Sequence, residues 1–230
     1  MTAIAQKRIM RDVMNVTHTD VKLLESQGIF YFPNESNISE GTALLIGQEG
    51  TPYFGGFYYF SITFPHDYPF SPIAIQSLTQ DGKTRFNPNM YLNGKVCLSI
   101  LNTWHDGPQW TGIQTLESVL LIIMSDVLNR NPLENEPAFR GCGDSTDAVI
   151  YRRQIWHANV SMIHTMLSRT PVFATSHAAL MLAEFAKRRE AILAVNDSVL
   201  ELHGITETCR VFSMTVKYDF LNISEKLRTL

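Results

Sequence analysis

A short segment with three prolines limits the folds open to this chain more than any other feature of its sequence. Pro65, Pro69 and Pro72 lie within eight residues, and proline has no backbone N–H to donate to a sheet ladder. A run rich in aromatic and β-branched residues stands on each side, Phe57–Thr63 before the prolines and Ile73–Ser77 after them. We therefore expect a rigid loop between two neighbouring strands.

Further periodic segments complete a domain around this loop. Two more strand-like runs, Gly28–Phe32 and Thr42–Ile46, precede it, so the four runs predict an antiparallel meander. Apolar residues recur at helical spacing in about Ala3–Met14 and in Ile113–Leu128, which predicts a helix before the meander and a central helix after it. This order indicates an α+β domain with its helices on one side of the sheet.

The last third of the chain reads as mostly helical. One helix should end near Pro171, and a second should begin at Ser176 as its cap and close at Gly204. The segment Phe212–Ile223 fits a helix, although its apolar residues also alternate as in a strand; we predict a helix. We expect a catalytic core at residues 1–150 and a C-terminal helical extension at 151–230, packed on the core.

Bulk composition restricts the classes of function. The sequence has 19 basic and 22 acidic residues, so no overall basic field favours nucleic acid as a partner. Its three cysteines are far apart and odd in number, which predicts neither disulfides nor a paired-cysteine zinc site. No apolar run is long enough to span a bilayer, and no signal peptide is evident. We expect an intracellular protein of the cytoplasm or nucleus, with no membrane partner.

The candidate chemistry lies in Arg85–Leu101, where Cys97 follows Asn89 by eight residues. A thiol and a neutral amide donor suggest acyl chemistry. Taken alone, a cysteine flanked by apolar residues is more often a small buried hydrophobe. His105 follows in a segment that looks like a surface loop, where a histidine is more often solvated than catalytic. No histidine has a ligand partner at metal spacing and no glycine-rich phosphate loop occurs, so we expect no metal and no cofactor.

The wider pattern resembles the ubiquitin-conjugating enzyme family. The resemblance rests on the cysteine block, the Pro65–Pro72 segment, Trp104, Trp110 and Asn135–Pro137. It runs from about Ile4 to about Phe139, and it is strongest toward an extended branch of larger conjugating enzymes. It implies a UBC-like fold.

The resemblance also implies roles for three residues. Cys97 matches the cysteine that accepts ubiquitin from the activating enzyme as a thioester and then yields it to a lysine amine. Asn89 matches the amide thought to donate to the oxyanion, although it can also simply tie a turn. Glu136 matches an acidic position that helps to orient the incoming amine, with a solvated loop charge as the alternative. Asn87 and Phe86 depart from the family's usual His and Tyr, and Asn87 can supply an equivalent side-chain bond.

Partner surfaces follow from the same resemblance. Lys7, Arg8 and Arg11 match the basic face of the first helix, which meets the activating enzyme. Phe70 and Ile113 match the two loops through which family members meet ubiquitin ligases. The expected partners are ubiquitin or a ubiquitin-like protein, the activating enzyme, a ligase and the lysines of protein substrates.

Three functions are weighed on this basis. The first is a conjugating enzyme that forms a thioester on Cys97. The second is an inactive variant of the same fold that only binds ubiquitin or a ligase; variants of that type lack the cysteine, so Cys97 favours the enzyme. The third, a cysteine hydrolase, needs an oriented histidine base for which the sequence gives no signature.

Overall fold

The chain forms two compact units in a computed structural model that describes residues 1–230. The first, here called the sheet unit, comprises residues 1–45, 58–80 and 89–127. The second, the C-terminal unit, comprises residues 46–57, 81–88 and 128–230. This grouping differs from the division predicted at residue 150, which falls inside helix α4 (Thr146–Ser168). The C-terminal unit includes two loop segments from the first half of the chain, residues 46–57 and 81–88. The periodicity of the sequence does not predict that these segments belong with the later helices.

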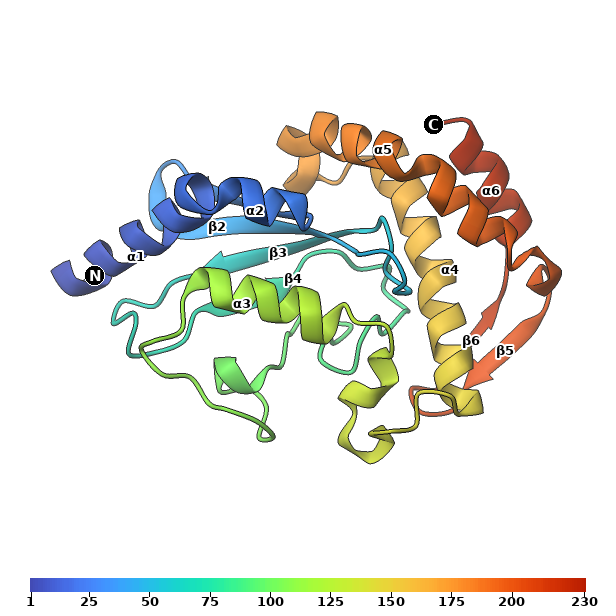
Figure 1. Ribbon diagram of the computed structural model, residues 1–230, viewed down its shortest axis with the longest axis horizontal. Coiled ribbons are helices and arrows are strands. Elements are labelled where there is room, and N and C mark those ends of the chain that lie inside the picture. The colour runs from blue at the N-terminus through green and yellow to red at the C-terminus, as the bar shows by residue number, and fades with distance from the viewer. The chain divides into compact units, whose positions relative to one another are not determined.

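A four-stranded antiparallel meander forms the sheet, as predicted. The strands are β1 (Ile29–Asn34), β2 (Asn37–Ile46), β3 (Phe57–Thr63) and β4 (Ala74–Ser77), in the spatial order β1-β2-β3-β4. The registers place Ile29 opposite Leu45, and Phe60 opposite Ser77. Helix α1 (Ala3–Met14) precedes the sheet at the predicted position and buries Ala5, Ile9 and Val13. The Oγ1 of Thr2 caps it by accepting the N–H of Ala5 at 3.1 Å. The expected α+β class is therefore confirmed (Figure 1).

Helix α3 (Leu116–Ile122) is the central helix, and it starts later than predicted. Thr115 has extended backbone and exchanges hydrogen bonds with Ser118, an arrangement that fixes the first turn at Leu116. Residues before Thr115 therefore belong to a loop, although Ile113 fits the apolar period. The helix continues as a π-helical turn, Ile123–Val127. A second π-helical turn, Asn15–Thr19, and a short helix, α2 (Val21–Ser26), lie between α1 and the sheet and were not predicted.

Three helices dominate the C-terminal unit (Figure 1). Helix α4 begins after its cap Ser145, and helix α5 (Ala178–Asp197) follows a 3-10 turn, Val172–His177. Ser176 lies within that turn and does not cap α5, so its predicted role was wrong. The predicted second helix was also too long, because a separate 3-10 turn, Leu200–Leu202, precedes Gly204. Helix α6 (Phe220–Arg228) ends the unit.

A β-hairpin replaces the first half of the helix predicted at 212–223. Strands β5 (Thr206–Cys209) and β6 (Met214–Lys217) pair antiparallel, with Cys209 opposite Met214. The turn between them includes Ser213 with a positive φ of 53°. The alternating apolar residues of this segment thus reflect a strand, and helical spacing alone was misleading.

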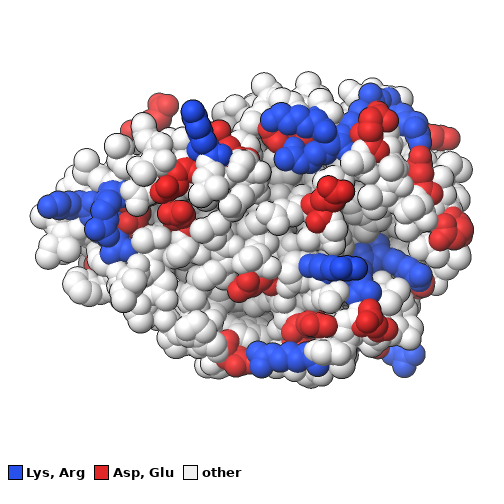
Figure 2. Space-filling view, in the orientation of Figure 1, with Lys and Arg blue, Asp and Glu red and all other residues white.

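Charges of both signs are interspersed over the face in Figure 2, with basic atoms gathered near the start of α1. This agrees with the near balance of acidic and basic residues in the sequence. None of the helices has both the length and the apolar character needed to cross a membrane.

His157 is a titratable group packed inside the C-terminal unit. Its Nε2 accepts the backbone N–H of Asp219 at 3.0 Å, and its ring packs edge-on against Tyr218 and Phe220. Burial lowers the pKa of His157 to about 4, and the charge of Lys83 acts in the same direction. The neutral imidazole is therefore the form that fits the fold.

We expect acid to destabilise the protein through His157. Its folded pKa lies below the unfolded value of about 6.5, so between these pH values the unfolded chain binds the proton and the folded chain does not. Stability should thus fall as pH drops from about 6.5 to about 4, by up to roughly 3 kcal/mol from this group. Urea unfolding across this range measures the loss. His157→Gln should lose less stability over the range than the wild type, whereas His105→Gln, at an exposed position, should match the wild type. If the free energy of unfolding changes equally with pH in all three proteins, the loss of stability in acid does not come from His157.

Candidate active site

A tight turn brings Cys97 next to Asn89. Gly94 occupies a left-handed conformation with φ of 86°, and its N–H donates to the carbonyl of Tyr91 at 2.9 Å. The chain then folds back so that Met90 pairs antiparallel with Val96. One residue further on each side, the N–H of Cys97 donates to the carbonyl of Asn89 at 2.9 Å. The Asn-Gly turn in the sequence therefore determines which residue faces the cysteine.

The side chain of Asn89 adds a second bond to the same residue. Its Nδ2 donates to the backbone carbonyl of Cys97 at 2.6 Å. Both polar main-chain groups of Cys97 are thus held by Asn89, and both residues are buried, with exposed fractions of 2% for Cys97 and 7% for Asn89. The structure brings together the two residues that the sequence singled out. It also gives the amide an anchoring bond, while its action on an oxyanion stays a prediction.

Two polar residues that the sequence analysis missed shape the chain after Cys97. The Oγ1 of Thr103 accepts the N–H of Leu98 at 2.9 Å. In turn, the N–H of Thr103 donates to the carbonyl of Leu98 at 3.1 Å. Asn102 has a positive φ of 57° and accepts the N–H of Trp110 through its side chain at 2.9 Å. Asparagine tolerates this conformation better than most residues, which is the signal that could have marked it. His105 lies exposed in the same segment, as expected.

An amide network in the C-terminal unit surrounds Asn87. Its Nδ2 donates to the hydroxyl of Tyr53 at 3.1 Å, and its Oδ1 accepts from Asn135 at 3.3 Å. The Tyr53 hydroxyl donates in turn to the carbonyl of Phe86 at 2.6 Å, and Asn129 donates to Asn135 at 2.8 Å. Asn87 is fully buried. The side-chain bond expected of Asn87 is therefore present, and it ties the segment before Asn89 to the Asn-Glu-Pro turn.

Glu136 lies in that turn, between two 3-10 turns that begin at Pro132 and Pro137. It is partly exposed. Its backbone N–H donates to the carbonyl of Leu133 at 3.0 Å, and its carboxylate makes no hydrogen bond or ion pair within the chain. Glu136 belongs to the C-terminal unit, whereas Cys97 and Asn89 belong to the sheet unit. Its predicted role with an incoming amine stays a prediction.

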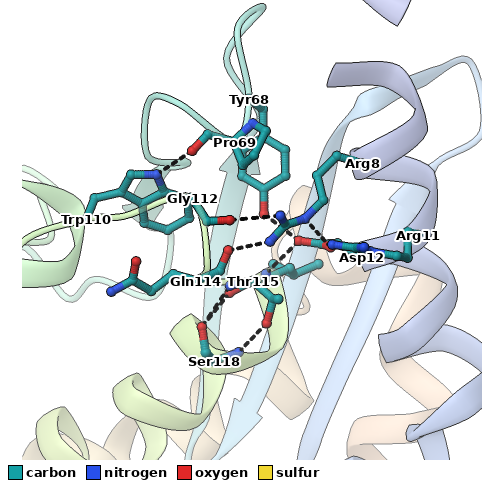
Figure 3. A network of polar contacts seen from close by, with 11 residues as sticks. Arg8, Arg11, Asp12, Tyr68, Pro69, Trp110, Gly112, Gln114, Thr115 and Ser118 are labelled. Carbon is teal, nitrogen blue, oxygen red and sulfur yellow. Dashed lines mark hydrogen bonds and ion pairs between the residues drawn. The ribbon is translucent and has the colours of Figure 1, made fainter. Parts of the chain in front are cut away.

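A buried carboxylate, Asp12, is the centre of a polar network that the sequence analysis missed (Figure 3). Asp12 is 1% exposed. Its Oδ1 accepts from Nε of Arg8 at 2.8 Å, and its Oδ2 accepts from the hydroxyl of Tyr68 and from the N–H of Leu116 at 3.3 Å. These partners come from α1, from the proline-rich loop and from the first residue of α3. The Arg-to-Asp spacing of four along a helix was the available signal.

Arg8 extends the network to the loop before α3. Its guanidinium donates to the carbonyls of Gly112 at 2.9 Å and Gln114 at 2.7 Å. Nearby, the indole Nε1 of Trp110 donates to the carbonyl of Pro69 at 2.8 Å, so this loop is also joined to the proline-rich loop (Figure 3).

Phe70 and Ile113 stand on these two anchored loops. Phe70 is 75% exposed and Ile113 is 87% exposed. Large apolar side chains so exposed on fixed backbone are suited to protein contact. Both residues are therefore available to a partner, and the ligase surface expected of them stays a prediction.

The basic cluster of α1 divides into two kinds of residue. Lys7 and Arg11 are exposed, and the Arg11 side chain lies 3.9 Å from the Asp12 carboxylate with 62% of its surface exposed. The Arg8 side chain is only 12% exposed and is occupied by bonds inside the sheet unit. Lys7 and Arg11 thus remain available for a partner, while Arg8 serves mainly to hold the loops.

Comparison with known proteins agrees with the geometry of this site. The family model described as ubiquitin-conjugating enzyme matches residues 8–147, more than half of the chain. The chain therefore belongs to the ubiquitin-conjugating enzyme family, and the resemblance drawn from its sequence is confirmed. The matched range includes Arg8, Asn89, Cys97 and Glu136.

Individual relatives cover the same part. The chain is 41% identical to ubiquitin-conjugating enzyme E2 Z of Xenopus tropicalis over 154 residues, which are 66% of this chain and 47% of that protein. For human ubiquitin-conjugating enzyme E2 Z the identity is 40%, over 66% of this chain and 42% of that protein. Human dual E2 ubiquitin-conjugating enzyme/E3 ubiquitin-protein ligase BIRC6 is 36% identical over 60% of this chain and 3% of its own length. The chain thus spans less than half the length of these relatives.

We expect two neighbouring arginines of α1 to differ sharply in their effect on stability. Arg8→Ala would leave the buried Asp12 carboxylate without its hydrogen-bonded cation and two carbonyls without a donor, at a cost of roughly 3–5 kcal/mol. Arg11→Ala removes an exposed and distant charge pair and should cost less than about 1 kcal/mol. Urea unfolding of both variants beside the wild type tests this. Equal and small losses would show that the network contributes little.

Proposed function

We propose that this chain is an active ubiquitin-conjugating enzyme that carries ubiquitin, or a ubiquitin-like modifier, as a thioester on Cys97. The observation that supports this best is the fixed position of Cys97, whose main-chain N–H and carbonyl are both bonded to Asn89 within the segment matched by the family. The presence of Cys97 disfavours the inactive variant of the fold.

The proposed reaction has two acyl transfers that conserve the thioester until the last step. First, the Cys97 thiolate attacks the thioester carbonyl joining the modifier to the activating enzyme, and the thiolate of that enzyme leaves. Second, the neutral amine of a lysine attacks the new thioester on Cys97. The tetrahedral intermediate expels the Cys97 thiolate, the amine loses a proton, and an isopeptide bond remains. A thiolate is both a good nucleophile and a good leaving group, so sulfur suits both steps.

The other predicted residues have roles in the second step. Asn89 would donate an N–H to the oxygen on which negative charge develops. Glu136, with its unbonded carboxylate, would orient the lysine amine and accept its proton. The pairing of the Cys97 and Asn89 backbones supports a joint role for the two residues. Transfer to a ligase cysteine would use the same thioester.

The partners we propose follow from the surfaces described above. Lys7 and Arg11 would meet acidic groups of an activating enzyme, since exposed charges mainly speed encounter. Phe70 and Ile113 would meet a ubiquitin ligase. A conjugating enzyme of this kind would work in the cytoplasm or nucleus, where thiols stay reduced.

We expect Cys97→Ala to abolish loading. The protein, incubated with a ubiquitin-activating enzyme, ATP and ubiquitin, should form an adduct that disappears under reducing agent, and the Ala variant should form none. Cys97→Ser should form a more stable oxyester that survives the reductant. Cys142→Ser is the matched control, because Cys142 is exposed and lies outside the cysteine block. A reducible adduct that persists in Cys97→Ala and vanishes in Cys142→Ser would contradict the proposal.

We expect Asn89→Ala to slow discharge to free lysine more than it slows loading. Loss of the bond to the Cys97 carbonyl should slow both steps by a common factor, whereas loss of an oxyanion donor should slow discharge by a further factor of about 10²–10³. The ratio of the two rates is therefore the informative quantity. It should be measured with single-turnover loading and with preloaded protein. If the ratio of discharge rate to loading rate is the same in Asn89→Ala as in the wild type, Asn89 only anchors Cys97 and does not act on the oxyanion.

A further inference from the structure

A hollow in the C-terminal unit has the chemistry of a binding site and is lined by none of the residues proposed to act in the thioester reaction. Its volume is about 320 Å³ and it is open to solvent. It lies between the 50–54 loop, α4, α5 and the first residue of α6. The apolar part of its wall comes from Pro52, Phe54, Trp156, Val195, Val199 and Phe220.

Three arginines complete the wall of this hollow, and no acidic residue lines it. They are Arg130, Arg152 and Arg153. An arginine fork matches the geometry of a carboxylate and can hold it with two parallel hydrogen bonds. An apolar wall together with three arginine side chains therefore favours a ligand with an apolar body and negative charges at its edge.

The three arginines differ in how far the fold already uses them. Arg152 donates through Nη1 to the side chain of Asn131 at 3.1 Å and to the carbonyl of Gly143. Arg153 donates through Nη1 to Glu207 at 2.9 Å. Arg130 is exposed and makes no hydrogen bond or ion pair within the chain. All N–H donors of Arg130 are thus available to a ligand. A substitution at this position would break no hydrogen bond or ion pair within the chain.

We propose that this hollow binds an acidic–hydrophobic peptide segment of a partner protein. An aromatic or branched aliphatic side chain would occupy the apolar wall, and flanking Asp or Glu carboxylates would pair with the arginines. The volume is at the lower limit for ligand pockets and suits one or two side chains. Because the hollow is open, the peptide chain can continue past its rim. Nucleic acid would need a longer basic surface than these three side chains provide.

This site is independent of the thioester chemistry proposed for Cys97, and its test does not use that activity. The probe is the fluorescein-labelled peptide Ser-Gly-Asp-Phe-Glu-Gly-Ser, together with versions that have Trp or Leu in place of Phe. Fluorescence anisotropy with the full 230-residue chain should show saturable binding by at least one of them. Three further peptides test the chemistry: one with Asn and Gln for the acids, one with Gly for the apolar residue, and one with phosphoserine for the acids.

Variants of the chain link binding to the hollow. Arg130→Glu should weaken binding at least tenfold, because a charge-assisted bond is lost and a like charge is introduced. Arg130→Lys should recover part of the loss. Val195→Trp should also block binding, since Val195 is 41% exposed on α5 and a larger side chain there would fill the hollow. Arg169→Glu is the matched control, an exposed arginine outside the lining, and it should bind as the wild type does. Thermal unfolding verifies that each variant is folded.

Several results would overturn the proposal. The first is the absence of saturable binding by all three acidic peptides up to about 1 mM. The second is equal affinity for an acidic peptide and for the neutral version with Asn and Gln. Unchanged binding by folded Arg130→Glu and Val195→Trp would place any bound peptide elsewhere. Tighter binding of the phosphoserine peptide alone would assign the arginines to phosphate. A dimer of the wild type that Arg130→Glu dissociates would make a second copy of the chain the occupant.

Discussion

The ion pair between Arg8 and the buried carboxylate of Asp12 is the interaction on which the sheet unit depends most. A carboxylate that is 1% exposed has lost its water, and it is tolerated only when cations and donors replace that water. Arg8, Tyr68 and the N–H of Leu116 supply them. Each comes from a different segment of the chain, so the requirement to satisfy one charge joins α1, the proline-rich loop and α3.

This dependence explains how exposed residues can be held in fixed positions. Phe70 and Ile113 have little packing of their own, since most of each side chain is exposed. Their backbones are ordered through neighbours: Trp110 bonds the carbonyl of Pro69, and Arg8 bonds the carbonyl of Gly112. Arg8 therefore helps to fix the proposed partner surface at Phe70 and Ile113 without belonging to it. Its replacement would remove the hydrogen bonds that hold the carbonyls of Gly112 and Gln114, so its charge should not be counted with those of Lys7 and Arg11.

Local patterns were predictable from the sequence, and long-range polar contacts were not. Strand β3 and helix α1 have the predicted bounds because apolar periodicity and turn residues act within a few positions. The hydroxyl that reaches Asp12 lies 56 residues away in the chain, and no local pattern reports such a pair. Strand β6 was mistaken for part of a helix because the apolar residues of its segment satisfy both periods. Cys97 and Asn89 were found through the resemblance of the cysteine block to the family, and the turn at Gly94 is what makes their pairing local.

Amide side chains do most of the positioning around the candidate site, and their chemistry suits that task. Asn87, Asn89 and Asn102 each bond a backbone or side-chain group of a neighbouring segment. An amide offers donors and an acceptor in one neutral group, so its burial avoids the cost of removing a charge from water. It also keeps the same bonds across the physiological pH range, whereas a histidine changes its donors near pH 6.5. With asparagine at position 87, where the family usually has histidine, the bonds to Tyr53 and Asn135 do not depend on proton uptake. The geometry of this segment should accordingly respond to pH only through groups outside the network.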